Sequence, residues 1–172
     1  VFIMREQATR RPAADRPSAL APPRPAGPSA GEVEKARMAV DAAVEACAAS
    51  MRRRIIEGVI AGKHETVFAD MGGMPVRGQV VSADEDGVLL KTGAGTFPAA
   101  WASLAGKRFA DMSSKYAGDA PAERVQLAVL YAVAEELDKA GEYAAGAGDA
   151  GEQWNTLAAQ VRLLVEAGAA QR

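Results

Sequence analysis

The pattern of hydrophobic and polar positions divides the chain into strand-like and helical stretches. Over residues 65–101, apolar residues alternate with polar ones, and turn-forming glycines and acids separate short runs. On either side, alanine-rich stretches repeat apolar residues every three or four positions, as amphipathic helices do. The pattern therefore predicts an α+β fold with one small β-unit between a long N-terminal helix and a C-terminal helical hairpin.

The N-terminal helix is predicted over residues 31–63, with Ser29 as its cap. Its apolar residues recur at steps of three, four or seven and so form one stripe. Ile56 and Ile60 widen this stripe near the end of the helix, which predicts packing on the β-unit. The stripe consists of Val33, Val40, Val44, Cys47, Met51, Ile55 and Val59.

The β-unit is predicted over residues 64–118, including a helical segment that closes it. Glycine pairs and an acidic turn at residues 72–73, 84–87 and 93–95 supply the conformations that tight hairpins need. Gly78, in the middle of a strand, indicates a bend or bulge that would let the strands curl. We therefore expect a small antiparallel β-barrel of the SH3/Sm-like type.

Trp101 lies where the last strand passes into the closing helix. We interpret it as a plug for the open end of the barrel, with a ligand-stacking platform as the alternative. In the first case, Val80, Leu89 and Trp101 are expected to be buried together.

The C-terminal part, residues 119–172, is predicted to form a hairpin of two helices. The first begins at Pro121, continues through Leu137 and is stopped by the glycines that begin at Gly141. The second places Trp154, Leu157 and other apolar residues on one face.

The first thirty residues differ in composition from the rest. Residues 1–30 are rich in proline, alanine and arginine and have few large apolar side chains, so we expect a disordered linker. Residues 1–31 carry five arginines against two acids, whereas residues 119–172 carry nine acids against four basic residues. The apolar residues 1–4 and the absence of a starting Met suggest a piece of a longer chain, with the tail of a membrane helix as one interpretation.

Candidate chemistry is sparse. A single cysteine, Cys47, excludes a disulfide framework and a cysteine-based zinc site, and its place on the apolar stripe indicates a buried thiol. The single histidine, His64, has no partner histidines for metal binding or catalysis. The arginines at residues 52–54 are interpreted as a solvated helix face, and the acidic turn lacks the spaced ligands of a calcium loop. We therefore expect no catalytic, cofactor-binding or metal-binding residues, and no enzyme.

A resemblance to a known group of sequences adds context. Residues 70–80, 87–90 and 96–98, with Trp101 and Leu104, resemble uncharacterised segments of large planctomycete-type bacterial proteins. Such segments place an SH3/Sm-like β-unit between a long helix and helical hairpins, often as C-terminal extensions of serine/threonine kinases or in surface proteins. The resemblance implies an accessory or scaffolding module, while the chain itself contains no kinase motif.

These features leave two classes of function. The first is a non-catalytic protein-interaction or scaffolding module that binds a partner protein or adjacent domains of a longer chain. The alternative is a nucleic-acid-binding barrel, although the acidic helices make nucleic acid the less favoured partner. A cytoplasmic location is favoured, with tethering to a membrane through an upstream helix as the other interpretation. The candidate interaction surface consists of Arg77, Lys91, Trp101, Lys107 and Arg108.

Overall fold

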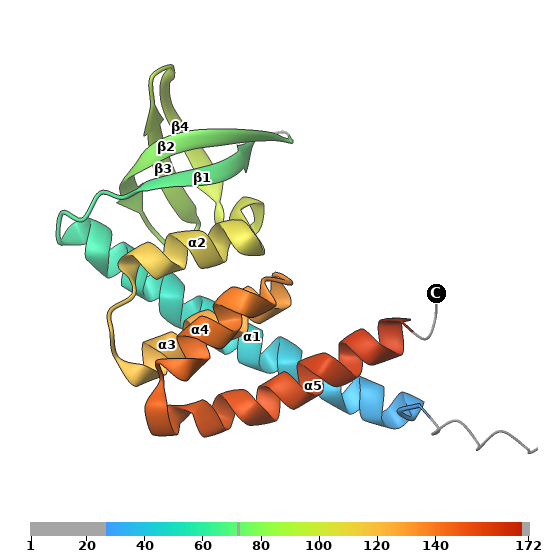
Figure 1. Ribbon diagram of the computed structural model, residues 1–172. Helices are drawn as coiled ribbons and strands as arrows, with labels where there is room; N and C mark the ends of the chain where they lie inside the picture. The colour runs from blue at the N-terminus through green and yellow to red at the C-terminus, as the bar shows by residue number, and fades with distance from the viewer. Residues whose placement is uncertain (1–26, 72, 170–172) are drawn as a thin grey trace, which may run out of the picture.

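The computed structural model describes residues 27–71 and 73–169 of the 172-residue chain. Residues 1–26 of the predicted linker lie outside the described part of the chain. The apolar residues 1–4, interpreted above as the tail of a membrane helix, are among them. Within the described part, the α+β class is confirmed: a four-stranded antiparallel sheet packs against helices that precede and follow it (Figure 1).

The N-terminal helix α1 spans Ala30–Ile60. Ser29 is its N-cap as predicted, and Glu32 completes a capping box, in which each side chain bonds to the other residue's backbone. The burial stripe includes Val40, Met51, Ile55 and Val59, so the predicted periodicity is confirmed there. Ile60 does not belong to the stripe, because it lies at the last turn and is 79% exposed.

The four strands form a meander in which each strand pairs with the next. Their bounds are Thr66–Met71 for β1, Met74–Ala83 for β2, Gly87–Thr92 for β3 and Gly95–Ala100 for β4. Because β1 and β4 do not pair with each other among the described residues, the sheet is open, and the expected closed barrel is not formed. Val67, Ala69, Val80 and Leu90 form the buried side of this sheet.

The irregularity in β2 lies after the predicted position. The register between β2 and β3 shifts between Val80 and Ser82, so the bulge is not at Gly78. Gly78 serves close packing instead, because a Cβ there would lie 3.0 Å from Leu90 Cβ.

A short 3-10 helix, η1 (Trp101–Leu104), follows β4 and contacts both edge strands, β1 and β4. Trp101 is buried, meets Phe109 edge-on at a centroid distance of 6.0 Å, and donates from Nε1 to the Asp84 carbonyl at 3.0 Å. These contacts agree with the plug interpretation. The expectation that Leu89 joins the same cluster is wrong. Side chains along β3 alternate between the two sides of the sheet, and Leu90 is the fully buried one.

The C-terminal part contains three α-helices where the sequence predicts two. The predicted first helix breaks after Val133, where Glu135 has a positive φ of 62°, and this break leaves Leu137 58% exposed. The helices after the sheet are α2 (Lys107–Tyr116), α3 (Pro121–Val133), α4 (Leu137–Ala145) and α5 (Gly151–Ala169), with the 3-10 helix η2 (Gly148–Ala150) before α5.

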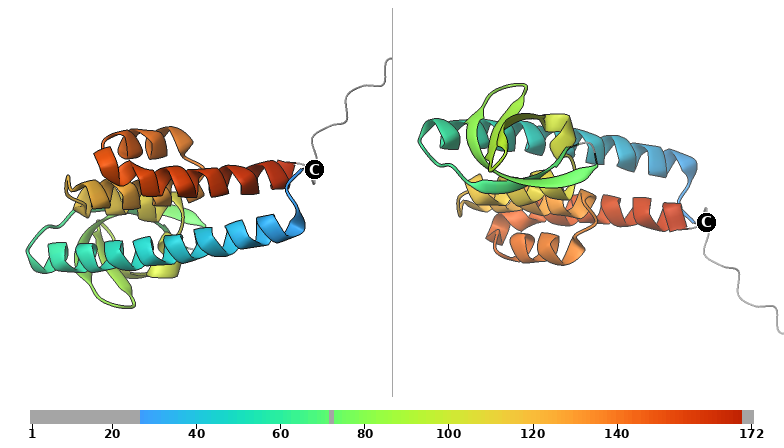
Figure 2. Two further views of the ribbon diagram at one scale, coloured as in Figure 1. Left: turned by 90° about the horizontal axis from the view of Figure 1, so that it is seen from below. Right: turned by 90° about the horizontal axis from the view of Figure 1, so that it is seen from above.

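α3 lies at the centre of the helical part and contacts α1, α2, α4 and α5. α1 and α5 lie side by side in opposite directions (Figure 2), joined by a small apolar cluster around Val40, Leu157 and Val161. The main core lies between α1, the buried side of the sheet, α2 and α3. Arg54 of α1 pairs with the buried Glu123 of α3, whose carboxylate also accepts from the Gly118 amide.

Candidate functional site

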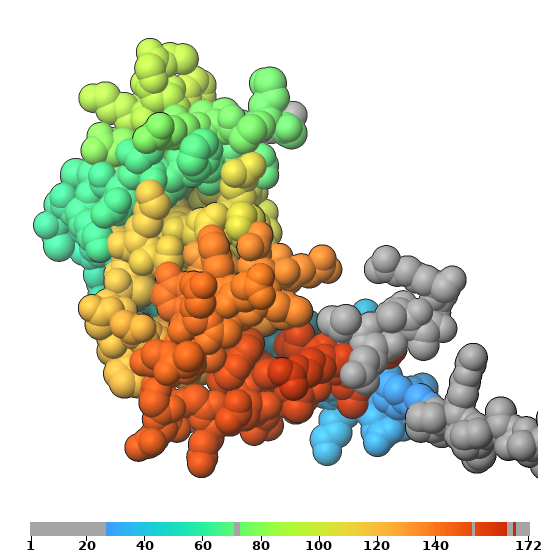
Figure 3. All heavy atoms as spheres, viewed as in Figure 1, coloured from blue at the N-terminus to red at the C-terminus, as the bar shows by residue number. Residues whose placement is uncertain are grey.

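A cavity of about 640 Å³ lies between β1, α2, α3 and α4. We call it the β1–α4 groove; in Figure 3, the yellow surface of α2 is exposed between the green sheet and the orange surface of α4. Its volume lies within the range of small-molecule pockets. The groove is lined by Thr66, Val67, Phe68, Arg108, Asp111, Met112, Ser114, Lys115, Arg124, Tyr131, Lys139, Glu142 and Tyr143.

The free edge of β1 forms one wall of this groove. The Val80 amide donates to the Glu65 carbonyl at 2.9 Å, so with the two-residue period of an antiparallel pair, Val67 and Ala69 also bond to β2. The peptide groups of Thr66 and Phe68 consequently face away from β2, on the unpaired edge. The Phe68 side chain is 50% exposed, which is a large apolar surface to leave in water.

The helix α2 supplies the floor, because Arg108, Asp111 and Lys115 recur at spacings of three and four on one face. Arg108 holds the Asp70 carboxylate with two bonds, at 3.1 Å from Nε and 3.2 Å from Nη2. Lys115 Nζ donates to the Thr66 carbonyl. Among the described residues, no carboxylate lies within ion-pair distance of Lys115, so its charge is not neutralised within the fold.

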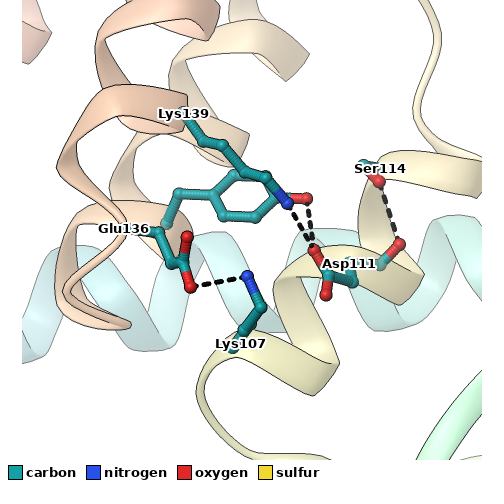
Figure 4. Close-up of polar contacts among 6 residues, drawn as sticks. Lys107, Asp111, Ser114, Glu136 and Lys139 are labelled. Atoms are coloured by element: carbon teal, nitrogen blue, oxygen red, sulfur yellow. Dashed lines mark hydrogen bonds and ion pairs between the residues drawn. The ribbon is translucent and has the colours of Figure 1, made fainter.

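The third wall comes from α3 and α4, and Asp111 links it to α2. Asp111 Oδ1 accepts from Tyr131 Oη at 3.0 Å and from Lys139 Nζ at 3.1 Å (Figure 4). Lys139 also lies 4.9 Å from the centre of the Tyr131 ring, and that ring stacks on Tyr143 at 5.4 Å. These contacts fix two stacked tyrosines in the lining of the groove.

Two polar groups beside the groove have raised pKa values. Burial, with further support from the Asp111 hydrogen bond, raises the pKa of Tyr131, so its phenol stays protonated near neutral pH. At the rim, the hydrogen bond to Glu136 raises the pKa of Lys107, which keeps this amine charged (Figure 4). Both groups therefore hold one protonation state across the physiological range, and neither is suited to proton transfer there.

The residues proposed from the sequence fall into three places. Arg77 and Lys91 are exposed on the outer side of the sheet, where Arg77 faces Phe68 across strands β1 and β2. Lys107 and Arg108 lie on α2, and only Arg108 lines the groove. Trp101 is buried at the corner after β4. The fold thus does not bring the five residues together into one surface.

Other residues considered from the sequence have structural contacts. Burial raises the pKa of the Cys47 thiol to about 11, which disfavours the reactive thiolate. His64 donates from Nδ1 to the Val80 carbonyl at 2.9 Å, and so secures the connection between α1 and β1. Asp84 caps its own turn by accepting from the amides of Asp86 and Gly87, as a hairpin turn does.

No cluster of three or more histidine, cysteine or acidic side chains that could hold a metal ion occurs among residues 27–71 and 73–169. None of the helices in this part of the chain is both long and apolar enough to cross a membrane.

The sequence reasoning missed most of the groove. The spacing of Arg108, Asp111 and Lys115 carries a signal, since it places them on one helix face. Nothing in the sequence shows that this face meets Phe68, Tyr131 and Tyr143, which come from other elements. The break at Glu135 matters as well, because it creates α4 and so brings Lys139 and Tyr143 to the groove.

Comparison with known proteins gives no relative from which a function could be transferred. No family model matches the chain, and no curated protein or solved structure matches it either. The functional interpretation therefore rests on the geometry and chemistry of the groove.

Proposed function

We propose that the protein is a non-catalytic interaction module that binds a segment of a partner protein in the β1–α4 groove. One observation carries this proposal: the groove brings together the half-exposed Phe68, the stacked Tyr143 and the un-neutralised Lys115. Exposed aromatic surface beside an available cation is typical of recognition sites. The partner is an unrelated protein or an adjacent domain of a longer chain.

The use of the titrating groups supports binding over catalysis. Asp111, Lys139 and Tyr131 bond to one another and connect α2 to α3 and α4, so they act as supports of the groove wall. A rigid wall reduces the entropic cost of ordering a bound segment.

The small sheet also supports a scaffolding role. We propose that the sheet is an open variant of an SH3/Sm-like unit, because it has four meandering strands and its end is covered by η1 with the buried Trp101. The sequence resembles accessory segments of planctomycete-type bacterial proteins. If this chain is such a segment of a longer protein, the β-unit would position the groove relative to neighbouring domains. Membrane tethering would then come from outside this module.

Selection from a phage library of random peptides tests the proposal. The full chain is immobilised, and enriched peptides are re-tested on the variants Phe68→Ser and Tyr143→Ala. Enriched peptides are expected to lose binding to both variants and to keep it on Ile60→Ser, a matched change at an exposed apolar residue of α1. The proposal fails if no peptide is enriched, or if the enriched peptides bind all variants equally.

The alternative function, nucleic-acid binding, uses the outer side of the sheet. The register places Phe68 opposite Arg77, and Gln79 opposite Lys91, so an exposed aromatic ring and two cations share this side. Bases stack on such rings while cations contact the phosphates.

Labelled single-stranded RNA, titrated at about 50 and 200 mM salt, tests this alternative. Micromolar affinity at the lower salt that is lost in Arg77→Ala or Lys91→Ala would favour it. We expect only weak binding, because the described residues carry 20 acidic against 14 basic side chains.

A further inference from the structure

We infer that the segment bound in the β1–α4 groove is acidic and extended, with a carboxylate at Lys115 and an apolar side chain between Phe68 and Tyr143. The inference rests on the proposed function and specifies the chemistry of the partner.

The distribution of charge in the groove is the first support. Its lining includes four basic residues, Arg108, Lys115, Arg124 and Lys139, and two acidic ones, Asp111 and Glu142. A carboxylate inside the fold neutralises each basic residue except Lys115: Asp70 pairs with Arg108, Asp119 with Arg124, and Asp111 with Lys139.

Lys115 thus leaves one favourable place for an incoming carboxylate. Its bond to the Thr66 carbonyl fixes the amine at the groove wall and uses only one of its three donors. A charge-assisted hydrogen bond to a fixed amine loses less side-chain entropy than one to a mobile surface lysine.

Two further pairs can adapt to a second acidic residue. Asp119, the partner of Arg124, has a 96% exposed side chain, and Asp70, the partner of Arg108, has a 47% exposed one. Ion pairs so exposed to water contribute little free energy to stability, so a ligand carboxylate can replace either aspartate at small cost.

The apolar and backbone groups determine the remaining chemistry. Phe68 and Tyr143 offer ring surface to a side chain such as leucine or phenylalanine, while the peptide groups of Phe68 lie on the unpaired edge of β1. An extended segment can hydrogen-bond to these groups in the way that peptides bind sheet edges. A helical segment could not, because its own peptide groups are already bonded.

The acidic side chains of the groove argue against a polyanion. A nucleic acid would bring several adjacent phosphates against Asp111 and Glu142. A peptide with separated carboxylates avoids these two positions.

Fluorescence anisotropy with two defined peptide pools tests the inference. The acidic pool has a central phenylalanine, leucine or tyrosine flanked on each side by one aspartate or glutamate, with Ser-Gly ends and a fluorescein label. The neutral pool replaces the acids by asparagine and glutamine. The full chain is expected to bind the acidic pool about tenfold more tightly than the neutral one, as expected for a charge-assisted contact.

Three variants locate the contact. Lys115→Gln should weaken binding of the acidic pool about tenfold, and Lys115→Arg should restore most of it. Lys91→Gln removes an equal charge from the outer side of the sheet and should change affinity less than about twofold. Glu142→Gln should strengthen binding about twofold, a gain that a folding defect could not produce.

The outcomes separate this inference from the proposed function. Equal binding of the two pools, or no effect of either Lys115→Gln or Glu142→Gln, overturns the acidic segment. If the phage selection still yields groove-binding peptides of other composition, the interaction module stands and only its partner chemistry is wrong. If labelled RNA binds more tightly than the acidic pool and depends on Lys115, the groove is a nucleic-acid site and the inference is wrong.

Discussion

The two sides of strand β1 differ in what they contribute to the protein. Val67 and Ala69 are 2% and 0% exposed and belong to the core with α1 and α2, whereas Phe68 between them is 50% exposed. Alternation along one strand therefore places a core residue next to the exposed residue that we propose contacts a partner. Substitutions on the buried side should change the free energy of unfolding, and substitutions at Phe68 should change binding.

The largest effect is expected on the buried side, from Trp101→Ala. Trp101 is buried at the end of the sheet, so its loss leaves a cavity and an unpaired Asp84 carbonyl, at a cost of roughly 3–5 kcal/mol. Urea unfolding of the variant and the wild type measures this cost. An unchanged midpoint would contradict the plug interpretation, and an unchanged midpoint together with lost peptide binding would favour the ligand-stacking role.

A smaller effect is expected where a charge is buried. Glu123→Ala removes the acceptor shared by Arg54 and the Gly118 amide, which should cost about 1.5–3 kcal/mol. Asp138→Ala, an exposed acid in the first turn of α4, is the matched control and should stay within about 0.5 kcal/mol. If thermal melts of the two variants coincide, the buried pair does not hold α1 to α3.

The smallest effect on stability is expected on the exposed side of β1, from Phe68→Ser. Because half of this side chain is already in water, the free energy of unfolding should change by less than about 1 kcal/mol. Affinity for the acidic pool should nevertheless fall, since the ring supplies apolar surface to the ligand. A strong loss of stability would show that Phe68 is part of the core, and the contrast between the two sides of β1 would fail.

The sequence predicts elements better than it predicts the surfaces they build. The Ser29 cap, the α1 stripe and the turn at Asp84 depend on neighbouring residues, so local patterns reveal them. The break at Glu135 escapes such patterns because the apolar periodicity continues through it to Leu137.

The open edge of the sheet escapes prediction for a related reason. Turn residues predict hairpins but do not determine whether the first strand meets the last. The groove depends on both features, and its residues extend from Thr66 to Tyr143, so no local pattern could indicate it.

The most direct test of the central claim is a ¹⁵N–¹H correlation spectrum of the full chain titrated with the phenylalanine member of the acidic pool. We expect the largest shifts at the amides of Phe68, Lys115 and Tyr143, with Lys91 unchanged. Shifts centred on Arg77 and Lys91, or none at millimolar peptide, would contradict the assignment of the β1–α4 groove as the binding surface.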